Sequence, residues 1–244
     1  MKKRIYLKEI SIVIPFFNEK ERVEKSINIL SNYLAKNKIK IEIIFVNDGS
    51  KDLSNNLILK KLKKFKIRKN IKIKMINYLN NKGKGYAIIQ GMKKARYKWI
   101  LTCDFDMSVK PDTVNKWFKK KYITNKNFAY FASRNISSSK VETFFLRKLY
   151  GFFFRTMVKI LFGINLKDTQ CGFKLYYVTY LKKIINKLTS YGFVQDIEIV
   201  NELMKRKIKI IELPVYWRHM PNSKLSLLAD PLKMIIDLIK IKFK

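Results

Sequence analysis

The chain has 244 residues, 48% of them hydrophobic, and its 53 lysines and arginines against 18 acidic residues give a formal charge of +35. This length and composition exclude a chain too small or too polar to form a core, and the charge favours partners that carry phosphate: nucleotides, nucleic acid or anionic lipid. Only two cysteines and one histidine occur, which excludes a disulfide framework and a zinc site built from these residues.

The sequence shows no segment that would span a membrane. Its longest stretch without a charged residue, Ser26 to Ala35, is far shorter than the ~20 apolar residues that a spanning helix needs. No signal peptide is recognisable, and the two cysteines favour a reducing compartment. We therefore expect a location on the cytoplasmic side of a membrane, without a span. Lysine, isoleucine and asparagine are all plentiful, so part of the charge could equally reflect an AT-rich genome.

Strands and helices alternate in the first part of the chain. Runs of β-branched and apolar residues predict four strands, at 10–14, 41–46, 71–75 and 99–103. Apolar residues at helical spacing predict helices between them, at 23–34, 53–65 and 86–95. Asn18, followed three residues later by Glu21, predicts a capping box at the start of the first helix. The apolar side of the second helix is predicted from Leu53, Leu57, Leu62 and Phe65. This alternation predicts an α/β fold with a mostly parallel sheet flanked by helices.

Two carboxylates follow the fourth strand directly, in Asp104-Phe105-Asp106. Mg²⁺ and Mn²⁺ prefer hard oxygen ligands, are usually held by one or two carboxylates, and complete their shell with water and substrate phosphates. Asp104 and Asp106 are therefore candidate ligands for a metal that bridges a diphosphate. The same pattern is also typical of an ordinary turn or a helix cap, so its context has to decide.

Every strand in this region ends in a turn rich in acid, amide or glycine. These turns are 15–19, 47–50, 81–85 and 104–106. Ligands of open α/β sheets bind beyond the carboxyl ends of the strands, so we expect the four turns to converge on one crevice. The glycine turn at 81–85 has the spacing of neither a P-loop nor a dinucleotide fingerprint.

In this order and at these spacings, the four segments resemble the nucleotide-sugar half of the inverting GT-A glycosyltransferases. They are Ser11 to Glu19, Val46 to Ser50, Asn81 to Ala87 and Asp104 to Asp106. Further on, Asp168 to Lys174 resembles the hallmark of the dolichyl-phosphate sugar synthases, and Pro214 to Ser226 resembles the ending of that group. Phe105 departs from the small residue usual at its position, which leaves the donor sugar open.

The resemblance implies roles for named residues. Those implied to line the base and ribose pocket, with Asp48 reading the base, are Pro15, Phe17, Glu19 and Val46; Gly83, Phe105 and Gln170 are further candidates for substrate binding. Asp104 would contact the ribose or metal, and Asp106 would hold the metal on the diphosphate. Arg134 and Lys224 would neutralise phosphates. The residues implied to act on the acceptor phosphate and sugar are Asp168, Gln170, Cys171 and Lys174. Of all these, the candidate catalytic residues are Asp106, Asp168, Arg134 and Lys174.

Two further acids, Asp196 and Glu198, lie at the start of a predicted helix, where a preference of acids for the helix N-terminus explains them. Without the resemblance, Arg134 and Lys224 would be interpreted as two solvated cations among many.

The reaction implied is transfer of a hexose, with glucose from UDP-glucose favoured, to a polyprenyl phosphate. A phosphate monoester is largely ionised at neutral pH, so a single inverting displacement needs no general-base histidine, and His219 is the only histidine present. The alternatives are mannose from GDP-mannose and a polysaccharide acceptor. Outside this enzyme class stand a nucleic-acid-binding protein, favoured only by charge and aromatic content, and a scaffold without catalysis.

Two segments are apolar around most of a helix but carry a stripe of cations. They are 144–166 and the C-terminal 227–244, and both suit helices that lie in an anionic membrane surface. Packing of the two helices on each other, on a homo-oligomer partner or on a membrane protein explains the pattern equally well. We therefore expect a glycosyltransferase domain at 1–226, with a nucleotide-sugar half at 1–110 and an acceptor half at 111–226, followed by an amphipathic helix.

Overall fold

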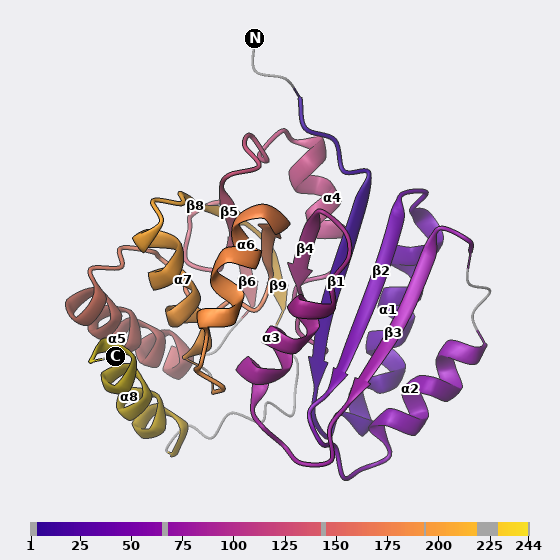
Figure 1. The fold of residues 1–244 in the computed structure, drawn as a ribbon, viewed down its shortest axis with the longest axis horizontal. Helices are drawn as coiled ribbons and strands as arrows, with labels where there is room; N and C mark the ends of the chain where they lie inside the picture. The colour runs from indigo at the N-terminus through magenta and orange to yellow at the C-terminus, as the bar shows by residue number, and fades with distance from the viewer. Residues whose placement is uncertain (1–3, 65–67, 143–144, 193, 219–228, 244) are drawn as a thin grey trace.

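The computed structural model describes residues 4–64, 68–142, 145–192, 194–218 and 229–243. Its centre is a seven-stranded sheet of order β3-β2-β1-β4-β7-β5-β8 (Figure 1). The strands are β1 (Glu9–Phe16), β2 (Lys40–Asn47), β3 (Ile71–Asn77), β4 (Trp99–Thr102), β5 (Ala129–Ser133), β7 (Lys174–Tyr177) and β8 (Ile210–Pro214). Strand β7 runs antiparallel to β4 and β5, and the other pairings are parallel. Strands β1, β2, β3, β4, β5 and β8 therefore end at the same edge.

Helices cover both faces of this sheet, which confirms the predicted α/β class. One face packs against α1 (Val23–Lys36), α2 (Ser54–Lys63) and α4 (Asp112–Lys119). The other packs against α3 (Lys84–Lys94), α5 (Phe145–Phe162), α6 (Val178–Ile184), α7 (Gln195–Lys205) and α8 (Ala229–Lys242). Smaller elements are the 3₁₀ turns η1 (Lys20–Arg22) and η2 (Ile185–Lys187), and a parallel pair formed by β6 (Lys140–Glu142) and β9 (Tyr216–Arg218).

Helix α3 lies close to the sheet because of Gly91. A Cβ atom at this position would lie 2.3 Å from Cγ1 of Val13 in β1 and 3.1 Å from Cγ2 of Val46 in β2. Only a residue without a side chain allows this approach, and the contact buries Val13 and Val46 completely. The approach places the first turn of α3 beside the carboxyl ends of β1 and β2, where the crevice was predicted.

The predicted capping box at Asn18 is wrong. Asn18 has a φ of 51°, and η1 intervenes before α1, which begins at Val23 without a side-chain cap. The Asn18 side chain instead accepts hydrogen bonds from the backbone N–H groups of Lys51 (2.8 Å) and Asp52 (3.3 Å). An amide at this position therefore joins the turn after β1 to the turn after β2.

The second helix buries part of the predicted apolar side, since Leu62 is buried and Leu57 packs against the core. Leu53 precedes α2 and is 54% exposed, whereas Ile58 and Leu62 pack into the core. Phe65 lies outside the described residues. Leu53 is exposed because the helix begins only at Ser54. Asp52 accepts hydrogen bonds from the N–H and hydroxyl of Ser54 and so shapes the turn before the helix.

The two predicted halves of the chain share one sheet. Strand β7, from the second half, lies between β4 and β5, and its Leu175 pairs with Leu101 of β4. Segments on both sides of residue 110 therefore reach the same sheet edge. Among the described residues, no helix is long and apolar enough to cross a membrane.

Candidate functional site

The acidic turn after β4 is held by the core beneath it. Phe105 is buried, and its ring centroid lies 5.6 Å from that of Phe16 and 6.4 Å from that of Phe45. The turn closes through a hydrogen bond from Met107 N–H to the Asp104 carbonyl (3.2 Å), and Met107 has a φ of 55°. Because the Phe105 side chain lies in the core, it does not face the crevice as a substrate-binding group would. It anchors the turn that carries the two carboxylates.

Asp104 forms an ion pair that the sequence did not indicate. Its Oδ1 lies 2.6 Å from Nζ of Lys84, the first residue of α3. Burial by itself would raise the pKa of Asp104, but the ammonium group of Lys84, together with the charges of Lys174 and Arg134, holds the pKa below its usual value. Lys84 is one of many lysines in the chain, so its spacing within the glycine turn was its only signal.

Asp106 has no ion-pair partner among the described residues. Its Oδ1 accepts a hydrogen bond from Ser108 N–H at 2.9 Å. The described residues hold no group of three His, Cys, Asp or Glu side chains suited to a metal. Two adjacent carboxylates nevertheless fit Mg²⁺ or Mn²⁺, which take most of their remaining ligands from water and phosphate. Asp104 and Asp106 are therefore the residues that would hold the ion.

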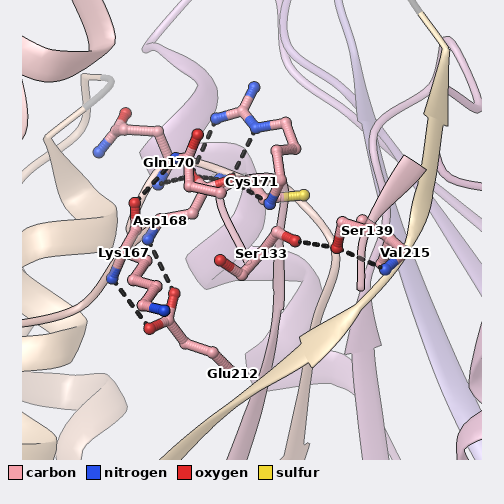
Figure 2. A network of polar contacts seen from close by, with 10 residues as sticks. Ser133, Ser139, Lys167, Asp168, Gln170, Cys171, Glu212 and Val215 are labelled. Carbon is pink, nitrogen blue, oxygen red and sulfur yellow. Dashed lines mark hydrogen bonds and ion pairs between the residues drawn. The ribbon is translucent and has the colours of Figure 1, made fainter. Parts of the chain in front are cut away.

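Arg134 and Asp168 form a bidentate pair at the end of β5 (Figure 2). Asp168 Oδ2 accepts from Nε of Arg134 at 2.7 Å, and Oδ1 accepts from its Nη2 at 2.9 Å. The guanidinium carbon also lies 5.7 Å from the ring centroid of Trp217. Burial alone would raise the pKa of Asp168, but the charge and hydrogen bonds of Arg134 lower it. The arrangement presents a fixed cation beside the crevice.

Asp168 differs in one respect from its predicted catalytic role. Its carboxylate also accepts hydrogen bonds from the N–H groups of Arg134, Gln170 and Cys171, so five donors surround it. A carboxylate accommodates about four hydrogen bonds, which leaves little capacity for a substrate. The geometry therefore makes Asp168 a residue that positions Arg134.

Lys174 and Asp196 form a second buried pair. Lys174 is 1% exposed, its Nζ lies 2.7 Å from Oδ1 of Asp196, and the same atom lies 5.3 Å from the ring centroid of Phe131. The interpretation of Asp196 as a mere helix N-terminal preference is therefore wrong, because a lysine from β7 reaches it through the core. Glu198 also has another role: its carboxylate accepts from the N–H groups of Thr189 and Ser190.

Charged side chains of both signs gather at the edge where β4 and β5 end. The group contains the cations Lys84, Arg134 and Lys174 and the carboxylates Asp104, Asp106, Asp168 and Asp196. Three cations face four carboxylates, so these side chains carry one net negative charge. Binding of a divalent cation would reverse the sign and so favour a diphosphate.

The glycine turn is fastened to the turn after β2 through Asp48. The Asp48 carboxylate accepts from Asn81 Nδ2 (2.9 Å), Lys82 N–H (2.9 Å) and Gly83 N–H (2.8 Å). Gly83 has a φ of 100°, and a Cβ there would lie 2.3 Å from the carbonyl oxygen of Tyr191. Reading of the base by Asp48 stays a prediction, and the observed role of its carboxylate is to shape the turn.

The other predicted residues occupy different depths. Pro15 and Val46 are paired in the sheet and buried, so the side chain of Val46 packs under α3 and does not face the crevice. Phe17 and Glu19 are partly exposed in the loop after β1, and Glu19 pairs with Arg22 at 3.0 Å.

Three further predictions concern the second half of the chain. Gln170 follows Asp168 and is partly exposed. Burial raises the pKa of the Cys171 thiol to about 12, so the thiol is protonated at neutral pH. Lys224 and His219 lie outside the described residues.

A pocket of about 490 Å³ lies between the glycine turn and the C-terminal helix α8. Its walls are Asn81–Gly83, the 189–192 loop, and Asp237, Lys240 and Ile241 of α8. A Cβ at Gly192 would lie 3.2 Å from Oδ2 of Asp237. Helix α8 therefore lies across this pocket from the glycine turn.

Replacing Gly172 with alanine is expected to disable the acidic turn. The new Cβ would lie 2.3 Å from both carboxylate oxygens of Asp104, so Asp104 must move away from Lys84. We expect affinity for Mn²⁺ with UDP to fall about tenfold or more, measured by calorimetry. Gly151→Ala is the control, because its Cβ would meet no atom closer than 3.7 Å. Unchanged binding in Gly172→Ala would show that the position of Asp104 is unimportant for the nucleotide.

The sequence matches a family of known proteins. The family model described as "Glycosyl transferase family 2" matches residues 11–185. A dolichyl-phosphate beta-glucosyltransferase from Trichomonas vaginalis is 31% identical over 242 residues, which cover 95% of this chain and 72% of the relative. A protein of the same name from Saccharomyces cerevisiae is 32% identical over 248 residues, covering 96% and 74%.

Solved structures share the fold. Glucosyl-3-phosphoglycerate synthase from Mycobacterium tuberculosis in complex with UDP gives a TM-score of 0.66 at 15% identity, over 97% of this chain and 80% of that one. The complex of that synthase with Mn²⁺, UDP and glucosyl-3-phosphoglycerate gives a TM-score of 0.65 at 16% identity, with the same coverage. At this identity the likeness concerns the fold alone, which is of the GT-A type.

Proposed function

Because this chain belongs to glycosyl transferase family 2 and is a hexosyltransferase, we propose that it moves glucose from UDP-glucose to a polyprenyl phosphate of the dolichyl type. The relatives named for this reaction support the proposal, since the match extends over most of each chain. Transfer of mannose from GDP-mannose is the second candidate. It is kept because Phe105 departs from the small residue usual at the centre of the acidic turn, which leaves the donor sugar open.

The observation that carries the proposal is the grouping of charges at one sheet edge. Two carboxylates follow β4, one of them paired with Lys84, and Arg134 follows β5. These strands end at the same edge, so a diphosphate between them would meet a metal ion on one side and a guanidinium on the other.

The proposed reaction is one displacement at the anomeric carbon. An oxygen of the acceptor phosphate forms the new bond to this carbon, the bond to the donor diphosphate breaks with its electron pair, and the configuration inverts. The acceptor oxygen is already ionised at neutral pH, so no side chain has to remove a proton. A bound Mg²⁺ or Mn²⁺ supplies charge neutralisation for the departing nucleoside diphosphate.

Protein side chains supply the remaining stabilisation. Asp104 and Asp106 would hold the ion, and Lys84, at the start of α3, keeps Asp104 in place. Arg134 is held rigidly by Asp168, so its charge is already oriented when negative charge develops on the leaving group. Lys174 is buried and paired with Asp196, which suits support of the cluster more than direct contact with the sugar.

Helices α5 and α8 lie side by side at one flank of the molecule and suit attachment to an anionic membrane surface (Figure 1). Large exposed apolar side chains among their described residues are Phe152, Phe153 and Ile160 of α5 and Ile236 and Ile239 of α8, and Phe243 follows directly after α8. Lys240 and Lys242 of α8 lie among them, and cations near anionic headgroups contribute ~1 kcal/mol each. The helices pack on each other as well, so the two interpretations left open by the sequence are compatible.

Replacing Phe152 and Phe153 with serine is expected to weaken membrane attachment. Burial of a phenylalanine side chain contributes about 1.5–3 kcal/mol, and both residues are more than half exposed, so affinity for vesicles should fall at least about tenfold. Co-sedimentation with phosphatidylserine vesicles at low and high salt would measure it, and high salt should weaken the wild type too. Leu79→Ser is the control, because Leu79 follows β3 and is 93% exposed. Equal binding of both variants would place the membrane contact elsewhere.

A transfer assay tests the proposed reaction directly. Purified protein is incubated with Mg²⁺ or Mn²⁺, polyprenyl phosphate and labelled UDP-glucose or GDP-mannose in parallel, and label entering the organic phase is counted. Label from UDP-glucose that disappears with chelator is the expected result. Label from GDP-mannose alone would select the second candidate. Label from neither donor, with nucleotide binding intact, would contradict a lipid phosphate acceptor.

A further inference from the structure

Glu212 is an acidic residue within the apolar strand β8, and no substrate role explains it. Its Oε2 accepts a hydrogen bond from Lys167 N–H at 2.9 Å, and its Oε1 accepts from Asp168 N–H at 2.8 Å (Figure 2). One carboxylate thus binds two consecutive backbone amides of the loop that leads from α5 to β7. Charge-assisted bonds of this kind are short and directional, so the loop is fixed relative to β8.

The same loop carries the partner of Arg134. Asp168 accepts from the backbone N–H of Arg134 (2.9 Å) as well as from Nε and Nη2 of its side chain. Asn135, the next residue, donates from Nδ2 to the carbonyl of Lys167 at 2.8 Å. The segment 167–168 is therefore held from β8 on one side and from the end of β5 on the other. These two strands are parallel neighbours, with Phe131 beside Glu212 in the register.

We propose that Glu212 is a positioning residue for the transfer reaction: it fixes the 167–168 segment so that Asp168 holds the Arg134 guanidinium at the crevice. Strand β8 ends beside β5, so a carboxylate on β8 can fix from a second side a loop that Asp168 and Asn135 hold from the end of β5. The guanidinium needs this support because it is partly exposed, with 29% of its side chain open to solvent. The inference rests on the proposed function through the role given to Arg134.

A purely structural role for Glu212 makes a different prediction. If Glu212 only stabilised the loop, its loss would lower the amount of folded enzyme or act independently of Arg134. If it acts through Arg134, its loss has little further effect once the bidentate guanidinium is gone. Energetic coupling between the two positions therefore distinguishes the roles.

The experiment is a double-mutant cycle of Glu212→Gln with Arg134→Lys. Glutamine keeps the size of the Glu212 side chain, but its NH₂ group cannot accept a hydrogen bond from one of the two backbone amides. Lysine keeps the charge of Arg134 but loses the bidentate geometry. We expect Glu212→Gln alone to lower kcat about tenfold, with affinity for UDP within about twofold of wild type. In the Arg134→Lys background the same change should lower kcat by no more than about twofold.

Glu198→Gln is the matched control, because Glu198 also binds two consecutive backbone amides, those of Thr189 and Ser190. The fold-change in kcat caused by Glu198→Gln should be the same in the wild-type and the Arg134→Lys backgrounds. An equal tenfold loss for Glu212→Gln in both backgrounds would overturn the proposal, as would wild-type kcat in the single variant.

A readout independent of turnover separates this proposal from the proposed function. With ¹⁵N-labelled arginine, the Nε–H signal of Arg134 is the one missing in Arg134→Lys, and in the wild type it should exchange slowly because it is bonded to Asp168. Glu212→Gln should speed this exchange at least about tenfold, and Glu198→Gln should leave it unchanged. If the wild type transfers no sugar, the proposed function fails while this signal still decides the positioning role; an unchanged signal in Glu212→Gln would refute that role.

Discussion

Asp106→Ala is expected to lower sugar transfer by about a thousandfold while the protein stays folded. Asp106 is the carboxylate of the acidic turn that has no cationic partner among the described residues, so its charge is available for a metal ion. Its loss leaves Asp104 alone, already shared with Lys84, to hold the ion on the diphosphate. Removing one group that stabilises developing charge typically costs 10²–10³-fold, and loss of the metal adds to this cost.

The measurement combines transfer with nucleotide binding. Calorimetry with UDP should show affinity that rises with Mn²⁺ in the wild type and does not respond to Mn²⁺ in Asp106→Ala. Asp112→Ala removes a carboxylate from the first residue of α4 and serves as the control, with transfer within about twofold of wild type. Metal-dependent UDP binding that survives in Asp106→Ala would show that the ion is held elsewhere.

The first half of the site could be predicted from the sequence because its signals are local. A strand that ends in a polar turn appears as a short apolar run followed by acid or glycine, and four such runs in alternation with helices specify one sheet edge. Asp104 and Asp106 lie at that edge as expected. The order of the strands beyond β4 had no such signal, since β7 enters the sheet between β4 and β5 from a distant part of the chain.

The contacts that support the site escaped prediction because they join distant residues. Lys84 and Asp104 are far apart in sequence, as are Lys174 and Asp196, and a single sequence does not pair them. Val46 and Phe105 were predicted beside the substrate, but the pleat and the acidic turn direct both side chains into the core. Composition and spacing identify which segments reach the crevice, whereas the direction of each side chain depends on the packing behind it.

Asp168→Asn is expected to destabilise the fold as well as the reaction. Five donors converge on this buried carboxylate, three of them from Arg134. The NH₂ group of an asparagine would face some of these donors without accepting from them, and the guanidinium would lose its counter-charge. Breaking a buried pair by removing one partner typically costs 3–5 kcal/mol. Because Arg134 is partly exposed, we expect about 3 kcal/mol in the free energy of unfolding at pH 7, measured by urea denaturation.

The pH dependence of this loss follows from the lowered pKa of Asp168. A carboxyl group whose pKa is lower in the folded than in the unfolded protein contributes stability above its unfolded pKa, ~3.9, and loses that contribution as the pH falls through the folded value. The asparagine variant cannot titrate here. The difference between wild type and variant should therefore be constant from pH 7 to about pH 5 and shrink below about pH 4.

Urea midpoints at a series of pH values measure this difference. Asp112→Asn provides the control, because Asp112 has no cationic partner among the described residues. A gap that stays constant down to the lowest pH at which both proteins fold would mean that the pKa of Asp168 is the same in the folded and the unfolded protein, which would contradict this prediction. The shrinking gap is expected because burial alone would raise the pKa of Asp168, but the permanent charge and the hydrogen bonds of Arg134 lower it below its usual value.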